Sequence, residues 1–224
     1  NIISASLGFV YNLTQSTSVF TNIANAFRSP TIEELSSYAV HEAQASFDIG
    51  NKNLDVENTL GFDIGIRTLK EKFYFELNGY YNFINNYIYR KPTNLFYDDA
   101  IGFNFSDGLQ VFQYSQADAK IYGLESKINF EVFEGFSTTF IIDYVYGKNI
   151  DVDENLPKIP PLRAALEFRY YNHNYWVGLN WKISNEQTNI APNESSTKGY
   201  GIIDVYAGIR FLTGNFAHNI IFKK

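Results

Sequence analysis

The stretch Phe73–Phe83, FYFELNGYYNF, shows the pattern that decides the fold. Apart from one glycine, its odd positions are apolar or aromatic: Phe73, Phe75, Leu77, Tyr81 and Phe83. Its even positions are polar or tyrosine: Tyr74, Glu76, Asn78, Tyr80 and Asn82. Because successive side chains of a strand point to opposite faces, this alternation predicts a β-strand with one apolar face and one polar face.

The same alternation recurs in Leu60–Arg67, Tyr122–Val132 and Leu162–Tyr170, and no charged residue falls on the apolar face of these segments. A Lys or Arg on a lipid-facing strand costs about 2–4 kcal/mol at the bilayer midplane. The pattern therefore predicts a transmembrane antiparallel β-barrel. We expect lipid contact for Leu124, Phe75, Ile64 and Leu166, and a lumenal position for Glu125, Glu76, Asp63 and Glu167.

A soluble β-sandwich or barrel would alternate equally well, because one face of each strand is then buried in a core. Two further features favour the membrane. The strand-like segments reach a dozen residues or more, whereas strands of globular proteins average about 5–6 residues. The connections also alternate between short and long, as do the periplasmic turns and extracellular loops of membrane barrels.

We expect an all-β fold of about ten consecutive strands joined as a meander. Their ranges are 2–12, 17–28, 59–69, 73–90, 111–132, 136–147, 161–171, 175–185, 200–212 and 216–224. Short turns are expected near 14–16, 70–72, 134–135, 172–174 and 213–215. Long loops are expected at 28–58, 90–110, 148–160 and 185–199.

Composition agrees with this fold. The chain has 20 Phe and 17 Tyr but only 2 Trp, and aromatic residues are typical of the girdles at the two membrane interfaces. Six tyrosines near strand ends are expected to form such girdles: Tyr11, Tyr87, Tyr89, Tyr144, Tyr146 and Tyr170. The absence of Cys excludes a disulfide framework and a thiolate metal site.

The net charge of -6 is concentrated in the four long loops, which with their flanks carry 14 acidic and 7 basic residues. An acidic outer surface attracts cations and repels nucleic acid. The last segment, FAHNIIFKK, reaches Lys224 in what is expected to be the middle of a strand. Because an open sheet edge has no hydrogen-bond partner in lipid, we expect residues 1–224 to be part of a larger barrel.

Two short boxes flank the first long loop. Phe27-Arg28-Ser29-Pro30 ends one strand, and Asn51-Lys52-Asn53-Leu54-Asp55-Val56-Glu57 leads into the next. In this order and spacing they resemble the FRAP-like and NPxLxPE-like boxes in the barrel of TonB-dependent outer-membrane receptors. The box residues that carry the resemblance are Phe27, Arg28, Pro30, Asn51, Leu54 and Glu57, and the segments YSQADAKIYGLESKINFEV (114–132) and FAHNIIFKK (216–224) also resemble the family. Lys52 and Val56 stand where the family commonly has proline.

The resemblance implies a barrel of about 22 strands with a plugged lumen, in the outer membrane of a Gram-negative bacterium. It implies an N-terminal plug domain and a TonB-binding box, neither of which lies in these residues. Residues 1–224 would then be a partial receptor barrel in contact with outer-membrane lipid. Glycines on the polar face, namely Gly61, Gly65, Gly123, Gly178 and Gly208, would leave room for the plug or ease the coiling of the strands.

His41, Glu42 and Tyr38 are the candidate ligand-binding residues. They lie between the two boxes, where the resemblance places a haem-ligating histidine in haem receptors. Imidazole and carboxylate also suit divalent metals, so His41 and Glu42 are candidate metal ligands. No second histidine at metal-ligand spacing accompanies His41.

The sequence therefore favours energised uptake of a scarce metal, as a siderophore complex, as haem or as an ion such as zinc, through TonB. A passive porin-like channel and a surface adhesin are alternatives, as is a soluble carbohydrate-binding β-protein. No nucleophile elbow, phosphate loop or dinucleotide motif is present, so we expect neither an enzyme nor a bound cofactor. The identity of the substrate stays open at this stage.

Overall fold

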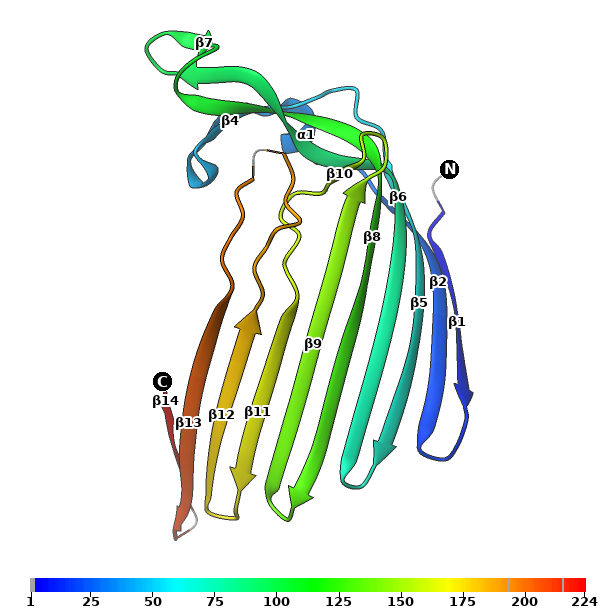
Figure 1. Ribbon diagram of the computed structural model, residues 1–224, viewed down its shortest axis with the longest axis vertical. Helices are drawn as coiled ribbons and strands as arrows, with labels where there is room; N and C mark the ends of the chain where they lie inside the picture. The colour runs from blue at the N-terminus through cyan, green and yellow to red at the C-terminus, as the bar shows by residue number, and fades with distance from the viewer. Residues whose placement is uncertain (1–2, 193, 215) are drawn as a thin grey trace.

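A computed structural model of the chain describes residues 3–192, 194–214 and 216–224 (Figure 1). Ten strands follow one another as an antiparallel meander. They are β1 (Ala5–Asn12), β2 (Thr17–Arg28), β5 (Glu57–Lys70), β6 (Phe73–Asp98), β8 (Leu109–Phe133), β9 (Phe136–Asn149), β11 (Arg163–Tyr171), β12 (Tyr175–Ser184), β13 (Tyr200–Thr213) and β14 (Phe216–Lys223). The predicted all-β meander is confirmed.

The short turns all lie at one end of the sheet and the long connections at the other (Figure 1). Three residues of the expected elements lie outside the described residues: Ile2 of the first strand, Asn193 of the last long loop and Asn215 of the last short turn. Among the residues that the structure describes, no helix has the length and hydropathy to cross a membrane.

The register separates the two faces as predicted. Cross-strand ion pairs join Arg67 to Glu76, Arg163 to Asp143 and Lys182 to Asp204 on the polar face. The opposite face carries Ile64 and Leu124, which are 62% and 43% exposed. A soluble sandwich would bury that face in a core, whereas a large exposed apolar surface is what lipid contact requires.

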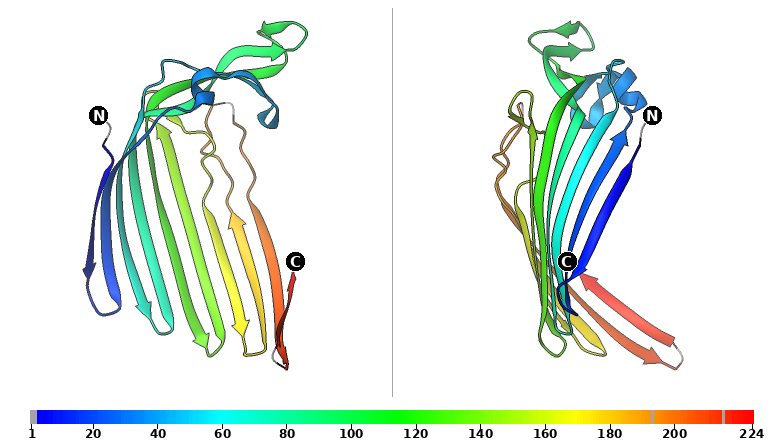
Figure 2. Two further views of the ribbon diagram at one scale, coloured as in Figure 1. Left: turned by 180° about the vertical axis from the view of Figure 1, so that it is seen from behind. Right: turned by 90° about the vertical axis from the view of Figure 1, so that its right-hand side faces the viewer.

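The sheet is curved and open within the described residues. β1 pairs with β2 and β14 pairs with β13, and these two outer strands are not joined to each other. Seen from the side, β1 and the β13–β14 hairpin bend toward the same side of the sheet (Figure 2). The chain thus forms a trough, with one long wall built from the meander.

The expected loop 90–110 is largely strand, which corrects the prediction. β6 has 26 residues and β8 has 25, whereas about 9–11 residues cross a membrane. More than half of each strand therefore projects beyond the membrane at the loop end, and β7 (Gly102–Asn104) pairs with β6 at the tip of this hairpin. Figure 1 shows the hairpin bending away above the other strands.

The expected loop 28–58 also has structure of its own. We call residues 29–56 the first loop. It contains α1 (Ile32–Ser36), β3 (Tyr38–His41), the 3₁₀ turn η1 (Glu42–Gln44) and β4 (Ser46–Ile49). β4 pairs in parallel with β8, with Ser46 opposite Gln110. The first loop is thereby attached to the projecting hairpin by a backbone ladder that no local pattern indicates.

Two further connections lie at the loop end. The third loop, residues 150–162, contains β10 (Glu154–Asn155), which pairs with the end of β9. The fourth loop, residues 185–199, is held by an isolated bridge between Gln187 and Thr197. Leu156 of the third loop is buried against Ile84 and Ala119 of the wall.

Aromatic rings cover four of the glycines on the polar face. Each ring belongs to the residue directly opposite in the neighbouring strand: Phe20 over Gly65, Tyr80 over Gly123, Trp176 over Gly208 and Tyr206 over Gly178. A methyl group added at Gly178 would lie 2.1 Å from Cζ of Tyr206. These glycines therefore accept flat-lying rings from the next strand.

Leu124 and Glu125 offer a test of the two faces. We expect Leu124→Arg to destabilise the barrel by about 2–4 kcal/mol if residue 124 lies near the midplane, because the charge would face lipid. Glu125→Arg should have little effect, because its side chain faces the polar side. Urea unfolding in lipid vesicles measures both, and equal costs for the two variants would contradict the assignment.

Gly178 lies under an aromatic ring and Gly79 does not, so alanine substitutions at these two positions test whether the rings rest on the glycines. Gly178→Ala should cost about 1–3 kcal/mol by overpacking, since it displaces the Tyr206 ring and the 2.5 Å hydrogen bond from its hydroxyl to Glu167. A methyl group at Gly79 meets nothing closer than 3.9 Å, so Gly79→Ala should be neutral or slightly stabilising. Unfolding measurements that rank the two variants the other way would show that the rings do not rest on the glycines.

Candidate functional site

An ion-pair clamp closes the base of the first loop. Arg28 is the last residue of β2 and lies directly opposite Glu57, the first residue of β5. Its guanidinium donates to both oxygens of Glu57, at 3.3 and 3.0 Å, and to both oxygens of Glu34 in α1, at 3.0 and 2.9 Å. Glu57 also accepts the backbone N–H of Ile88 at 3.0 Å. The two boxes of the sequence thus meet in one network.

Glu34 joins this clamp to the start of α1. Its carboxylate accepts the N–H of Thr31 at 2.7 Å, and the Thr31 hydroxyl accepts the N–H of Glu34 at 3.2 Å, which is a capping box. Burial acts to raise the pKa of Glu34, but the bonds from Thr31 and Arg28 outweigh it and lower the pKa. The charged clamp is therefore complete at neutral pH, and this contribution is lost only as the pH falls through the lowered pKa.

The other box residues shape the same loop. Leu54 is buried and packs with Ile88 and Tyr114. The Asn51 side chain accepts the N–H of Asn53 at 3.0 Å, which makes a local turn. Phe27 is half-buried near the end of β2, and Pro30 follows that strand. The boxes therefore serve to fasten the first loop to the barrel wall.

The structure places the three predicted ligand-binding residues on the β3–η1 segment. Tyr38 and His41 begin and end β3 and, being three residues apart, point to opposite faces of it. Tyr38 is 67% exposed and makes an edge contact with Phe47 at 5.2 Å between ring centroids. Nδ1 of His41 is buried without a hydrogen-bond partner, and Glu42 is exposed at the start of η1. Their ligand-binding role stays a prediction.

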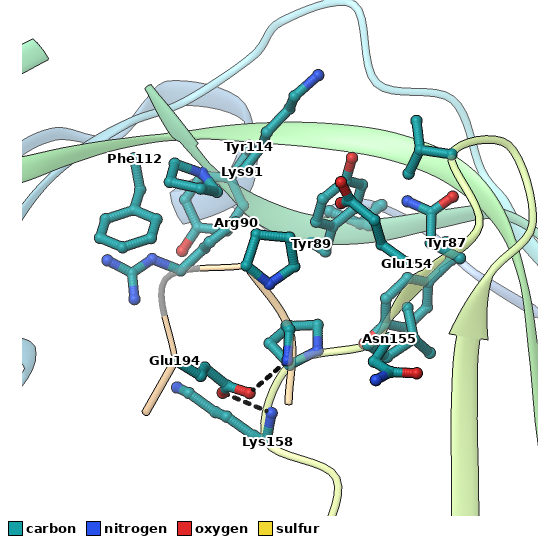
Figure 3. A pocket seen from close by; sticks show the side chains of 18 of the residues that line it. Tyr87, Tyr89, Arg90, Lys91, Phe112, Tyr114, Glu154, Asn155, Lys158 and Glu194 are labelled. Carbon is teal, nitrogen blue, oxygen red and sulfur yellow. Dashed lines mark hydrogen bonds between the residues drawn. The ribbon is translucent and has the colours of Figure 1, made fainter. Parts of the chain in front are cut away.

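A pocket of about 620 Å³ lies at the loop end of the polar face (Figure 3). This volume is in the range of small-molecule sites. Its walls come from β6, β8 and the third and fourth loops, with Gln44 of the first loop and Asn149 at the end of β9. The aromatic part of the lining consists of Tyr87, Tyr89, Phe112 and Tyr114, and the charged part of Arg90, Lys91, Lys158, Glu154 and Glu194. Among the described residues, no group of three or more His, Cys, Asp or Glu side chains is arranged to hold a metal ion.

Arg90 is the cation of the pocket that an ion pair, a hydrogen bond and a cation–π contact hold in place. Its guanidinium pairs with the carboxylate of Asp48, which is 1% exposed, and donates to Ser46 Oγ at 2.6 Å. It also lies over the ring of Phe112, with Cζ 4.5 Å from the centroid. Nearby, burial raises the pKa of Tyr114 to about 12, so its phenol stays neutral. Strand β4 of the first loop thus fixes the position of Arg90 on β6.

The third and fourth loops are tied together beneath Arg90. The Glu194 carboxylate accepts the backbone N–H groups of Lys158, at 2.9 Å, and Ala191, at 3.1 Å. Asn155 donates to the carbonyl of Ile190 at 3.2 Å. Figure 3 shows Glu194 and Lys158 on one side of the pocket and Asn155 on the other.

Tyr87 and Tyr89 correct the sequence prediction, which assigned them to a girdle on the apolar face. A β-bulge between Ile84 and Tyr87 inserts one extra residue into β6, with Asn86 at φ 56. Beyond it, odd positions of β6 lie on the polar side, where Tyr87 packs against the cluster of Ile84 and Ala119. The pair Asn85-Asn86 was the available signal, because asparagine tolerates positive φ.

Comparison with known proteins gives the family. The model of the TonB dependent receptor-like β-barrel matches residues 1–218. A copper transporter, OprC, superposes with a TM-score of 0.77 at 20% identity, over 92% of this chain and 31% of its own. The siderophore receptor PirA of Pseudomonas aeruginosa gives 0.69 at 19%, over 96% and 37%. A variant of the ferric enterobactin receptor PfeA of the same organism gives 0.71 at 16%, over 96% and 33%.

The chain belongs to the TonB-dependent receptor-like β-barrel family, as the two boxes indicated. Members of this family are transporters of the outer membrane of Gram-negative bacteria, not enzymes. The structural similarity at this level of identity shows the fold. The chain spans about a third of the length of the solved structures that it matches.

Arg28→Ala should free the base of the first loop. Without the guanidinium, Glu34 and Glu57 lose their shared partner and repel each other, so trypsin should cut after the exposed Lys52 several times faster. Arg67→Ala is the matched control, because Arg67 pairs with Glu76 on the same sheet but far from the loop. Equal cleavage at Lys52 in both variants and the unaltered protein would show that the clamp does not hold the loop.

Proposed function

We propose that the chain forms part of the barrel of an active transport receptor in the outer membrane of a Gram-negative bacterium, and that this receptor imports a scarce metal carried in a small organic complex. The observation that carries the proposal is the pocket of about 620 Å³ at the loop end. It faces the side from which an external ligand would arrive. A complete barrel of about 22 strands with a plug and TonB coupling would supply the transport step.

The lining of the pocket supports an organic ligand. The rings of Tyr87, Tyr89 and Phe112 offer flat contacts, and Arg90 and Lys158 offer positive charge. Such a mixture of apolar surface with a few charged groups is typical of small-molecule sites. A metal would then be bound mainly by the atoms of its organic carrier, and the protein would contact the carrier.

The solved structures that the chain resembles agree with this class of cargo. They include a siderophore receptor, a ferric enterobactin receptor and a copper transporter. A siderophore complex is therefore our first proposal for the ligand. A haem or a metal ion bound through His41 and Glu42 is the alternative that the sequence suggested, and binding measurements on variants separate the two.

We expect Tyr89→Ala and Phe112→Ala, introduced into the complete receptor, to weaken siderophore binding about tenfold or more, which corresponds to about 1.4 kcal/mol. Each removes a ring from the pocket wall. Phe105→Ala is the control, because Phe105 is 79% exposed on the same hairpin and outside the pocket. Binding of ferric catecholate, ferric hydroxamate and haem to isolated receptor gives the measurement.

His41→Ala should leave that binding unchanged if the pocket is the site. Loss of haem or zinc binding in His41→Ala, with normal barrel assembly, would instead move the site to the β3–η1 segment. Uptake that persists in cells without TonB would contradict active transport and favour a passive channel.

A further inference from the structure

Gln44 occupies a position between two cations at the edge of the pocket. Its side-chain oxygen Oε1 accepts hydrogen bonds from Nη1 of Arg90 on β6 and from Nζ of Lys158 in the third loop, the latter at 3.3 Å. Gln44 itself is the last residue of η1 in the first loop. One neutral amide oxygen therefore links the first loop, the barrel wall and the third loop.

The charge on one of these cations is unmatched. Arg90 is paired with Asp48. Among the ion pairs of the described residues, none includes Lys158, and the nearby Glu194 carboxylate binds the backbone N–H of Lys158 and not its ammonium group. Glu154, the other carboxylate of the lining, lies across the pocket on the side of Asn155 (Figure 3).

An anionic oxygen would bind at this position more strongly than the amide does. The bonds from Arg90 and Lys158 to the amide already have ionised donors, and a full negative charge on the acceptor would add coulombic attraction to both cations. Two cations whose side chains converge on one oxygen are an arrangement suited to a carboxylate, a phenolate or another oxyanion. The neutral amide satisfies their geometry while leaving the charge of Lys158 unmatched.

We propose that Gln44 Oε1 holds the place of a ligand oxyanion between Arg90 and Lys158. When an anionic ligand binds, its oxygen displaces the Gln44 amide, and the link between the first and third loops is released. The pocket therefore selects anionic complexes over neutral ones of similar size. This inference rests on the proposed function only in taking the pocket as the ligand site.

Two substitutions at Gln44 separate this role from a merely structural one. Gln44→Glu places a permanent carboxylate between the two cations, so it should weaken binding of a negatively charged ferric tris-catecholate at least tenfold. Gln44→Ala vacates the position and should bind the same probe as well as, or several-fold better than, the unaltered protein. A neutral ferric tris-hydroxamate should respond little to either substitution.

A second measurement follows the loops directly. Spin labels at Ala43 and Val152 in the complete receptor report the separation of the first and third loops. Gln44→Ala should broaden the distance distribution, and Gln44→Glu should narrow it. Citrate, a small tricarboxylate, should broaden it in the unaltered protein but not in Gln44→Glu.

The outcomes distinguish the two proposals. The role of Gln44 would be overturned if citrate and both substitutions leave the loop distances unchanged. It would also be overturned if the substitutions change catecholate binding no more than hydroxamate binding. Either result would count even if uptake is intact. Loop distances that respond as expected in a receptor that takes up no metal complex would support the role of Gln44 and refute the proposed function.

Discussion

The structure depends on the requirement that every backbone N–H and C=O of a strand in hydrocarbon be paired with a neighbouring strand. Among the described residues, consecutive long strands of the meander are neighbours, so every long strand from β2 to β13 pairs on both sides, while β1 and β14 pair on one side. The ladder leaves only the side chains free to vary, one face toward lipid and one toward the lumen. Because the turns at one end are short, chain that can build a binding site is concentrated at the other end.

The β-bulge in β6 lets one strand serve both purposes. Below it, odd positions such as Tyr81 and Phe83 lie on the apolar face, as a lipid-facing strand requires. Above it, the extra residue at Asn85-Asn86 turns Tyr87 and Tyr89 toward the polar side. Alternating residues of β6 therefore contact lipid within the membrane, and beyond it they form the aromatic wall of a pocket.

Local patterns predicted the meander, because the alternation of apolar and polar residues and the positions of turn residues are local properties of the chain. They also located both boxes, although the ion pair between Arg28 and Glu57 depends on strand register that the sequence alone did not supply. The strand in the first loop was not predicted, because β4 pairs with β8 more than sixty residues away, at Gln110, and no local pattern shows such a pairing. The pocket was not predicted either, because its residues come from distant parts of the chain and because one β-bulge moved its tyrosines to the other face of β6.

The buried pair of Arg90 and Asp48 explains why the two cations at Gln44 are not equivalent. A charge as buried as that of Asp48 is costly unless it is paired and hydrogen-bonded, so Arg90 is held on the wall and cannot move to meet a ligand. Lys158 is exposed on a loop, and its ammonium bonds the amide of Gln44. A ligand oxyanion would therefore meet one fixed donor and one adjustable donor, and any movement that follows its binding would fall on the third loop and not on the barrel wall.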